Sequence, residues 1–220
     1  MSGDCTCVCF TSRGDAVAGT IDSDLCTYSG HDYLLYKQSA PGSVWGICEY
    51  KQLIYVQCGD KTVEVYTYDL KKKLRTWELR FKASQLAVSN DLIYTINLDD
   101  GNIVKCSLDG QFKALLEHPS FVKPYSLKPY REDSIVVCDP KANAVFFFKK
   151  DCCVWQLELV NCSGVAVDWK AGNIWVKVFN KNEVTVLSQQ GNMCDCLLAF
   201  TLALECSKCF NLTLSSKYTQ

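Results

Sequence analysis

The sequence predicts an all-β protein, a β-propeller built from four-stranded blades of about 40 residues. A short apolar segment recurs along the chain, and polar turns separate it from other short segments of alternating polarity. The segment begins at Leu53, Leu92, Ile135 and Ile174, so successive copies start 39, 43 and 39 residues apart. Repeats of this length that contain strands and no helix are typical of propeller blades.

Each repeat divides into four predicted strands, with turns at sites such as Gly59-Asp60 and Asp109-Gly110. The first repeat has strands at 5–11, 16–21, 25–29 and 33–36, and the second at 44–50, 53–58, 63–68 and 74–80. The third has them at 85–89, 92–97, 103–108 and 112–116. The fourth has them at 125–128, 134–138, 144–148 and 153–159, and the fifth at 164–168, 173–178, 183–188 and 193–199.

The repeats predict one domain over residues 1–220. Its blades cover approximately 1–42, 43–82, 83–123, 124–163 and 164–200, and a partial sixth repeat covers 201–220 with strands at 202–206 and 212–216. We therefore expect a six-bladed ring with an incomplete last blade; a five-bladed ring is the alternative. In the six-bladed ring, an open edge would remain for a partner or a second copy of the chain.

Composition narrows the class of protein. The 220 residues are 48% hydrophobic, enough for a sizeable core, and the net charge of −1 gives no global attraction to nucleic acid or anionic lipid. The longest apolar run, 197–204, is far shorter than the roughly 20 residues that span a membrane. The N-terminus lacks the basic and apolar regions of a signal peptide. We expect a cytoplasmic protein without a membrane partner.

The chain has fifteen cysteines, which we interpret as free thiols of the core because Cys behaves as a small buried hydrophobe. Cys48, Cys58, Cys106 and Cys138 stand where a strand would carry Val or Thr. A zinc site is the alternative, and its candidate ligands are Cys5, Cys7, Cys9, Cys194, Cys196, Cys206 and Cys209. Alternate thiols on one strand lie roughly 7 Å apart, too far to chelate alone, so no metal or other cofactor is expected.

The fifth repeat carries a resemblance to a known family. It reads Gly-Val-Ala-Val-Asp at 164–168, Gly-Asn-Ile-Trp-Val at 172–176 and Asn-Glu-Val-Thr-Val-Leu at 182–187, and closes with Gly191. This resembles the NHL repeat, although Glu183 stands where the family usually has Arg. The resemblance implies a six-bladed propeller like those that recognise substrates or RNA in RING-type ubiquitin ligases. No RING, B-box or coiled-coil pattern occurs in these 220 residues.

The turns between second and third strands end at the same rim as the connections between blades, because strands alternate in direction. We call this the recognition rim and predict that it binds a protein or peptide without catalysing a reaction, since loops on a rigid scaffold often carry recognition. The predicted binding residues are Asp60, Lys61, Asp99, Asp100, His118, Lys123, Lys141, Asn143, Asn180 and Lys181. His118 is expected to be a surface residue.

Two alternative functions use other residues. A single-stranded RNA-binding propeller would use the basic residues of the opposite rim, which are Lys71, Lys72, Lys73, Arg75, Lys149 and Lys150. A Ca²⁺-dependent propeller hydrolase would use the recurrent acidic turn residues Asp60, Asp99, Asp100 and Asp139 with Asn180. Asp and Asn also occur in turns because they hydrogen-bond to the turn backbone.

Overall fold

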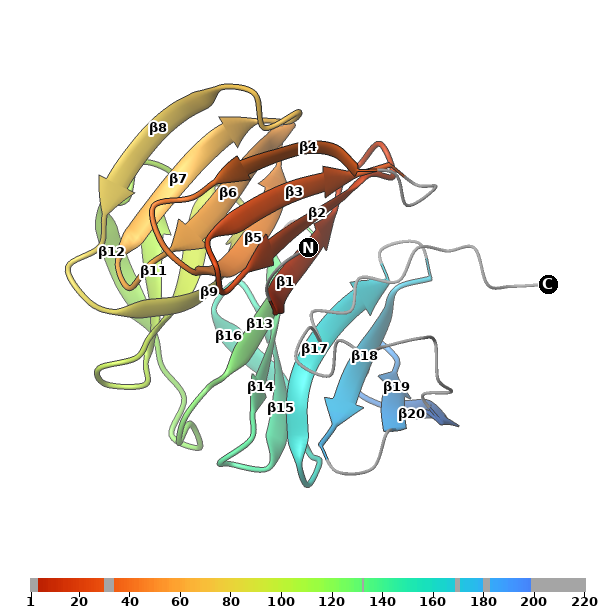
Figure 1. Ribbon diagram of the computed structural model, residues 1–220. Coiled ribbons are helices and arrows are strands. Elements are labelled where there is room, and N and C mark those ends of the chain that lie inside the picture. The colour runs from red at the N-terminus through yellow and green to blue at the C-terminus, as the bar shows by residue number, and fades with distance from the viewer. Residues whose placement is uncertain (1–3, 30–33, 132, 169–170, 180–182, 199–220) are drawn as a thin grey trace.

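The computed structural model contains five four-stranded antiparallel sheets, arranged as the blades of a propeller (Figure 1). It describes residues 4–29, 34–131, 133–168, 171–179 and 183–198. Within each blade the strands pair in chain order, and the first strands of consecutive blades pack against one another. The all-β propeller class and the five complete four-stranded repeats are thus confirmed. The predicted sixth repeat, 201–220, lies outside the described residues.

The strands lie close to their predicted positions. Blade 1 has β1 (Cys5–Phe10), β2 (Ala16–Thr20), β3 (Asp24–Tyr28) and β4 (Leu34–Ser39). Blade 2 has β5 (Val44–Tyr50), β6 (Leu53–Cys58), β7 (Thr62–Thr67) and β8 (Lys73–Glu78). Blade 3 has β9 (Ala83–Ser89), β10 (Leu92–Asn97), β11 (Ile103–Ser107) and β12 (Phe112–Leu116). Blade 4 has β13 (Ser126–Tyr130), β14 (Ser134–Asp139), β15 (Ala144–Lys149) and β16 (Cys152–Glu158). Blade 5 has β17 (Cys162–Asp168), β18 (Asn173–Val178), β19 (Glu183–Leu187) and β20 (Met193–Leu198).

The described residues form four buried apolar layers, each lying between two consecutive blades. In β6, Ile54 and Val56 pack toward blade 1, whereas Tyr55 packs toward blade 3. In β14, Val137 packs toward blade 3 and Val136 toward blade 5. A strand with both faces buried is apolar throughout instead of alternating with polar residues. This explains the recurrent apolar segment in the sequence.

The inner strands of neighbouring blades approach closely at Gly46 in β5. A Cβ atom at this position would lie 2.5 Å from the backbone nitrogen of Leu86 in β9. Polar contacts add to the apolar layers: the Lys51 ammonium lies 2.7 Å from the Asp91 carboxylate of the next blade, and the Tyr130 hydroxyl donates to the Gly172 carbonyl at 2.8 Å. Neighbouring blades are therefore held together by close backbone packing, by an ion pair and by a hydrogen bond between their side chains and turns.

Packing between blades follows chain order from blade 1 to blade 5. Strands of blades 1 and 2, 2 and 3, 3 and 4, and 4 and 5 pack against each other. Within the described ranges, no strand of blade 5 packs extensively against blade 1.

Described residues form no helix with the length and hydropathy of a membrane span.

The cysteines of the described blades mostly occupy the core. Cys48, Cys58, Cys106 and Cys138 are all buried and free of disulfides, as predicted for core thiols. Burial raises the pKa of the Cys48 thiol from 9.0 to about 12 and that of Cys106 to about 11. These thiols stay protonated in the native state at pH values where the unfolded chain releases their protons.

We predict that the free energy of unfolding falls as pH rises above about 9. In this range the unfolded state binds fewer protons than the native state, at a cost of about 1.4 kcal/mol per pH unit for each such thiol. Replacing Cys106 by Val should reduce this slope in urea titrations at pH 8, 9 and 10 under reducing conditions. The control replaces the exposed Phe112 by Ser, which removes no titratable group and should leave the slope unchanged. An unchanged slope in the Cys106 variant would contradict the prediction.

Candidate functional site

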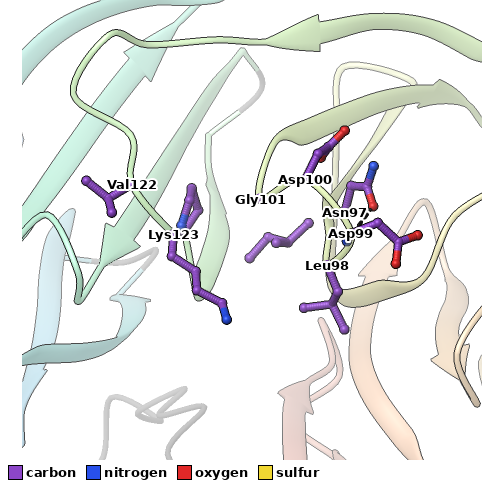
Figure 2. Close-up of a pocket in the computed structure, with 9 residues that line it drawn as sticks. Asn97, Leu98, Asp99, Asp100, Gly101, Val122 and Lys123 are labelled. Atoms are coloured by element: carbon purple, nitrogen blue, oxygen red, sulfur yellow. Dashed lines mark hydrogen bonds between the residues drawn. The ribbon is translucent and has the colours of Figure 1, made fainter.

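The recognition rim contains a cleft of about 220 Å³ between blades 3 and 4. One wall is the β10–β11 turn, and the other is the connection from β12 to β13 (Figure 2). Leu98, Asp99 and Asp100 lie on the first wall, and Val122 and Lys123 lie on the second. The remaining lining residues are Ile96, Asn97, Gly101 and Pro124. The structure thus brings together three predicted binding residues, Asp99, Asp100 and Lys123.

Hydrogen bonds within the turn fix the first wall. The Asn97 side-chain oxygen accepts a hydrogen bond from the Asp99 amide at 3.0 Å, and the Asp100 carboxylate accepts one from the Asn102 amide at 2.9 Å. Asp99 also accepts from the Lys82 amide at 3.2 Å, which links the turn to the start of the blade. These residues therefore shape the turn, as Asx residues commonly do, and both carboxylates remain exposed.

The second wall is held by one buried carboxylate. Asp139, at the end of β14, is 0% exposed and accepts four backbone hydrogen bonds. Its Oδ2 accepts from Val122 and Lys123 at 2.7 and 2.8 Å, and its Oδ1 accepts from Lys141 and Ala142 at 3.0 Å. Asp139 therefore ties the blade connection to the β14–β15 turn.

This role bears on the Ca²⁺ alternative, in which Asp139 is a ligand. A carboxylate has about four lone-pair positions, and backbone N–H groups fill those of Asp139. Among the described residues, His, Cys, Asp and Glu side chains form no group of three or more that could hold a metal ion. The same finding gives no support to zinc at the described cysteines. Cys206 and Cys209 lie outside the described residues, as does the side chain of Cys196.

The two walls present apolar surface and opposite charges. Leu98 is 48% exposed and Val122 is 65% exposed. Lys123 is exposed, and its ammonium has no ion-pair partner within the part of the chain that the structure describes. Sequence reasoning missed Leu98 and Val122 because it searched the turns for polar residues only. For Leu98, the sequence did offer a signal: a large apolar residue directly after the second strand of a blade.

The other predicted rim residues are more dispersed. Asp60 lies 3.5 Å from the ammonium of Lys82 and accepts the Ala83 amide through its backbone carbonyl, so it helps to join blades 2 and 3. Lys61 and Lys141 are exposed. Asn143 is half-buried and its side chain accepts from the Asn161 amide at 3.2 Å. Asn180 and Lys181 lie outside the described residues.

His118, which the sequence predicted as a surface histidine of the recognition rim, lies in an aromatic cluster. Its half-buried ring packs against Phe121, Phe146 and Phe148, with centroid distances of 5.7, 5.0 and 6.0 Å. Its Nδ1 accepts a hydrogen bond from the Ser120 amide at 3.3 Å. The phenylalanines of β15 come from a strand far along the chain, so a local sequence pattern did not indicate this aromatic cluster.

The basic cluster of the RNA alternative is partly neutralised. Lys73 lies 2.7 Å from the carboxylate of Glu64, and this hydrogen bond raises the pKa of Lys73. Glu64 is buried, and its carboxylate also accepts a hydrogen bond from the Tyr66 hydroxyl. The remaining basic residues of this set are exposed, and they are Lys71, Lys72, Arg75, Lys149 and Lys150.

Comparisons with known proteins establish the fold and no family. No family model matches the sequence, and no curated protein matches it either. A catalytically inactive variant of virginiamycin B lyase from Staphylococcus aureus with quinupristin has a similar structure, with a TM-score of 0.71 and 14% identity over 91% of this chain and 72% of that chain. U3-55K gives 0.69 and 11% over 90% and 65%, so this chain spans slightly less than two thirds of its length. A streptogramin B lyase gives 0.68 and 12% over 86% and 67%. At these identities the likeness shows the propeller fold alone.

We predict that Asp139→Asn destabilises the protein by about 1–3 kcal/mol, because an amide NH₂ would face two backbone N–H donors and leave them without an acceptor. The matched control is Asp100→Asn, whose exposed carboxylate accepts one turn amide and whose loss should cost about 0.5 kcal/mol or less. Urea denaturation measures both. Equal stability of the two variants would contradict this role, and a calcium-dependent melting temperature lost in Asp139→Asn would support the metal-binding alternative instead.

Proposed function

We propose that the chain is a non-enzymatic recognition propeller that binds a protein or peptide segment in the cleft between blades 3 and 4. The observation that carries this proposal is the arrangement of exposed apolar and oppositely charged side chains on two walls with fixed backbones. Leu98 and Val122 offer exposed apolar surface, and Lys123 lies on the second wall, whereas Asp99 and Asp100 lie on the first with side chains that point away from Lys123 (Figure 2). Such mixed surface fits a polypeptide better than a polyanion.

The rigidity of the walls favours binding. Hydrogen bonds from the turn backbone to Asn97, Asp100 and Asp139 hold both walls in place before any ligand arrives. A preformed site avoids part of the entropy cost of ordering loops on association. The ligand therefore meets side chains whose backbones are already positioned.

The alternative functions have less support from the described residues. Lys73, central to the RNA-binding set, is paired with Glu64, and Asp139 of the Ca²⁺ set is saturated by backbone donors. Two of the similar structures are lyases, yet a shared fold alone does not carry over an activity.

The proposal predicts that substitutions in the cleft abolish partner capture while the fold stays intact. The 220-residue chain, immobilised and exposed to cell extract, should retain a set of proteins that the double variant Leu98→Ser with Lys123→Glu loses. The control carries Phe112→Ser with Lys149→Glu, two exposed residues away from the recognition rim, and should retain the same set. Quantitative mass spectrometry compares the three captures, and melting curves verify folding. Equal capture by all three would refute recognition at this cleft.

We also propose that the blades are NHL-type and that the ring has six positions, with the sixth between blade 5 and blade 1. The fifth repeat supports the family assignment, and the lack of extensive packing between described strands of blades 1 and 5 supports the sixth position.

A ring completed within one chain predicts a compact monomer by sedimentation velocity and small-angle X-ray scattering. A concentration-dependent dimer would instead indicate that the open side of blade 1 or blade 5 pairs with a second copy.

A further inference from the structure

One register position of the recognition rim is non-polar in all five blades. It is the residue that directly follows the second strand, and its occupants are Ile21, Gly59, Leu98, Pro140 and Phe179. In four blades its amide donates to the carbonyl of a residue that precedes the first strand: Ile21 to Asp4, Gly59 to Ser43, Leu98 to Lys82 and Phe179 to Asn161, at 2.7 to 2.9 Å. The backbone at this position is therefore fixed in the same way in these four blades.

Three of these positions carry large side chains that the fold leaves exposed. Ile21 is 44% exposed, Leu98 48% and Phe179 56%. Turns usually hold Gly, Pro, Asn, Asp or Ser, and single exposed apolar residues need no explanation. These three residues belong to blades 1, 3 and 5, and Leu98 is the one that lines the cleft. Val122, on the second wall of the same cleft, is 65% exposed, so the cleft carries exposed apolar residues on both walls, and exposed apolar surface at a cleft marks an interaction site.

A carboxylate follows the non-polar residue in three consecutive blades. The pairs are Ile21-Asp22 in blade 1, Gly59-Asp60 in blade 2 and Leu98-Asp99 in blade 3, where Asp100 follows as well. All four carboxylates are exposed, although Asp60 lies near the Lys82 ammonium. Two carboxylates therefore follow Leu98 along the β10–β11 turn, with side chains that point away from Lys123 on the second wall (Figure 2).

We propose that the ligand is an extended polypeptide segment in which a large apolar residue stands next to Lys or Arg. This inference rests on the proposed function and names the class of partner for the same cleft. The apolar residue packs against Leu98, where both partners lose exposed apolar surface. Its basic neighbour pairs with Asp99 or Asp100, and Lys123 contacts a carbonyl or an acidic group further along the segment.

Charge complementarity decides between this occupant and others. An acidic segment or a nucleic acid would place its charges beside Asp99 and Asp100, and like charges in contact oppose binding. A purely apolar segment would cover both carboxylates without pairing them, which costs desolvation energy. A segment that combines an apolar residue with a cation satisfies both features of this wall.

The test selects peptides from a phage-displayed library of random 16-residue sequences on the immobilised full chain. Synthetic fluorescein-labelled copies of the enriched peptides are then titrated in fluorescence anisotropy. We expect enrichment of an aliphatic or aromatic residue adjacent to Arg or Lys. Leu98→Ser, and separately the double variant Asp99→Asn with Asp100→Asn, should each weaken binding about tenfold or more, as loss of a buried aliphatic contact or of a charge-assisted hydrogen bond can.

Matched controls use exposed residues away from the recognition rim: Phe112→Ser for the apolar contact, and Asp109→Asn on the opposite rim for the charges. Both should leave affinity unchanged. Selected peptides that lose affinity with the Leu98 variant but lack a basic neighbour would overturn this inference and leave the proposed function standing. Peptides insensitive to every rim substitution would overturn both, and a library without any enriched sequence would overturn this inference.

Discussion

Each blade of this protein depends on its neighbour to remove its apolar faces from water. Four apolar layers lie between five blades, and the middle strands contribute alternate side chains to the layers on either side. A four-stranded sheet with two apolar faces is unstable alone and becomes stable when it is stacked. The close approach of β5 and β9 at Gly46 shows how tightly this stacking fixes the relative positions of two blades. The rim is rigid because the blades beneath it cannot shift independently.

The candidate site is a consequence of that rigidity together with local hydrogen bonding. Its two walls come from different blades, so their separation is set by the layer between blades 3 and 4. Their backbones are fixed by polar side chains, above all by the buried carboxylate of Asp139. Structures similar to this one include lyases as well as U3-55K, so the shared fold by itself does not assign a function.

Acidic residues of the turns can hold the backbone or face a ligand, and the structure shows which residues are exposed enough to face a ligand. Asp139 is buried and saturated by backbone donors, whereas Asp99 and Asp100 each shape a turn and still present a carboxylate to solvent. The sequence pattern treats all three alike because each follows a strand and precedes a turn. Burial, which depends on the neighbouring connection, is what distinguishes a structural carboxylate from one that can meet a ligand.

The sequence alone determined the propeller class, the five complete repeats and most strand positions, because strands buried on both faces must be apolar and turns must be polar or flexible. It also placed Asp99, Asp100 and Lys123 on one rim, since strand direction alternates in each blade. Only the tertiary structure decided that these three share a cleft with Leu98 and Val122, and that His118 packs among phenylalanines. These contacts join residues of different repeats. The repeat pattern describes every blade in the same way, so it does not indicate which residues of two stacked blades meet.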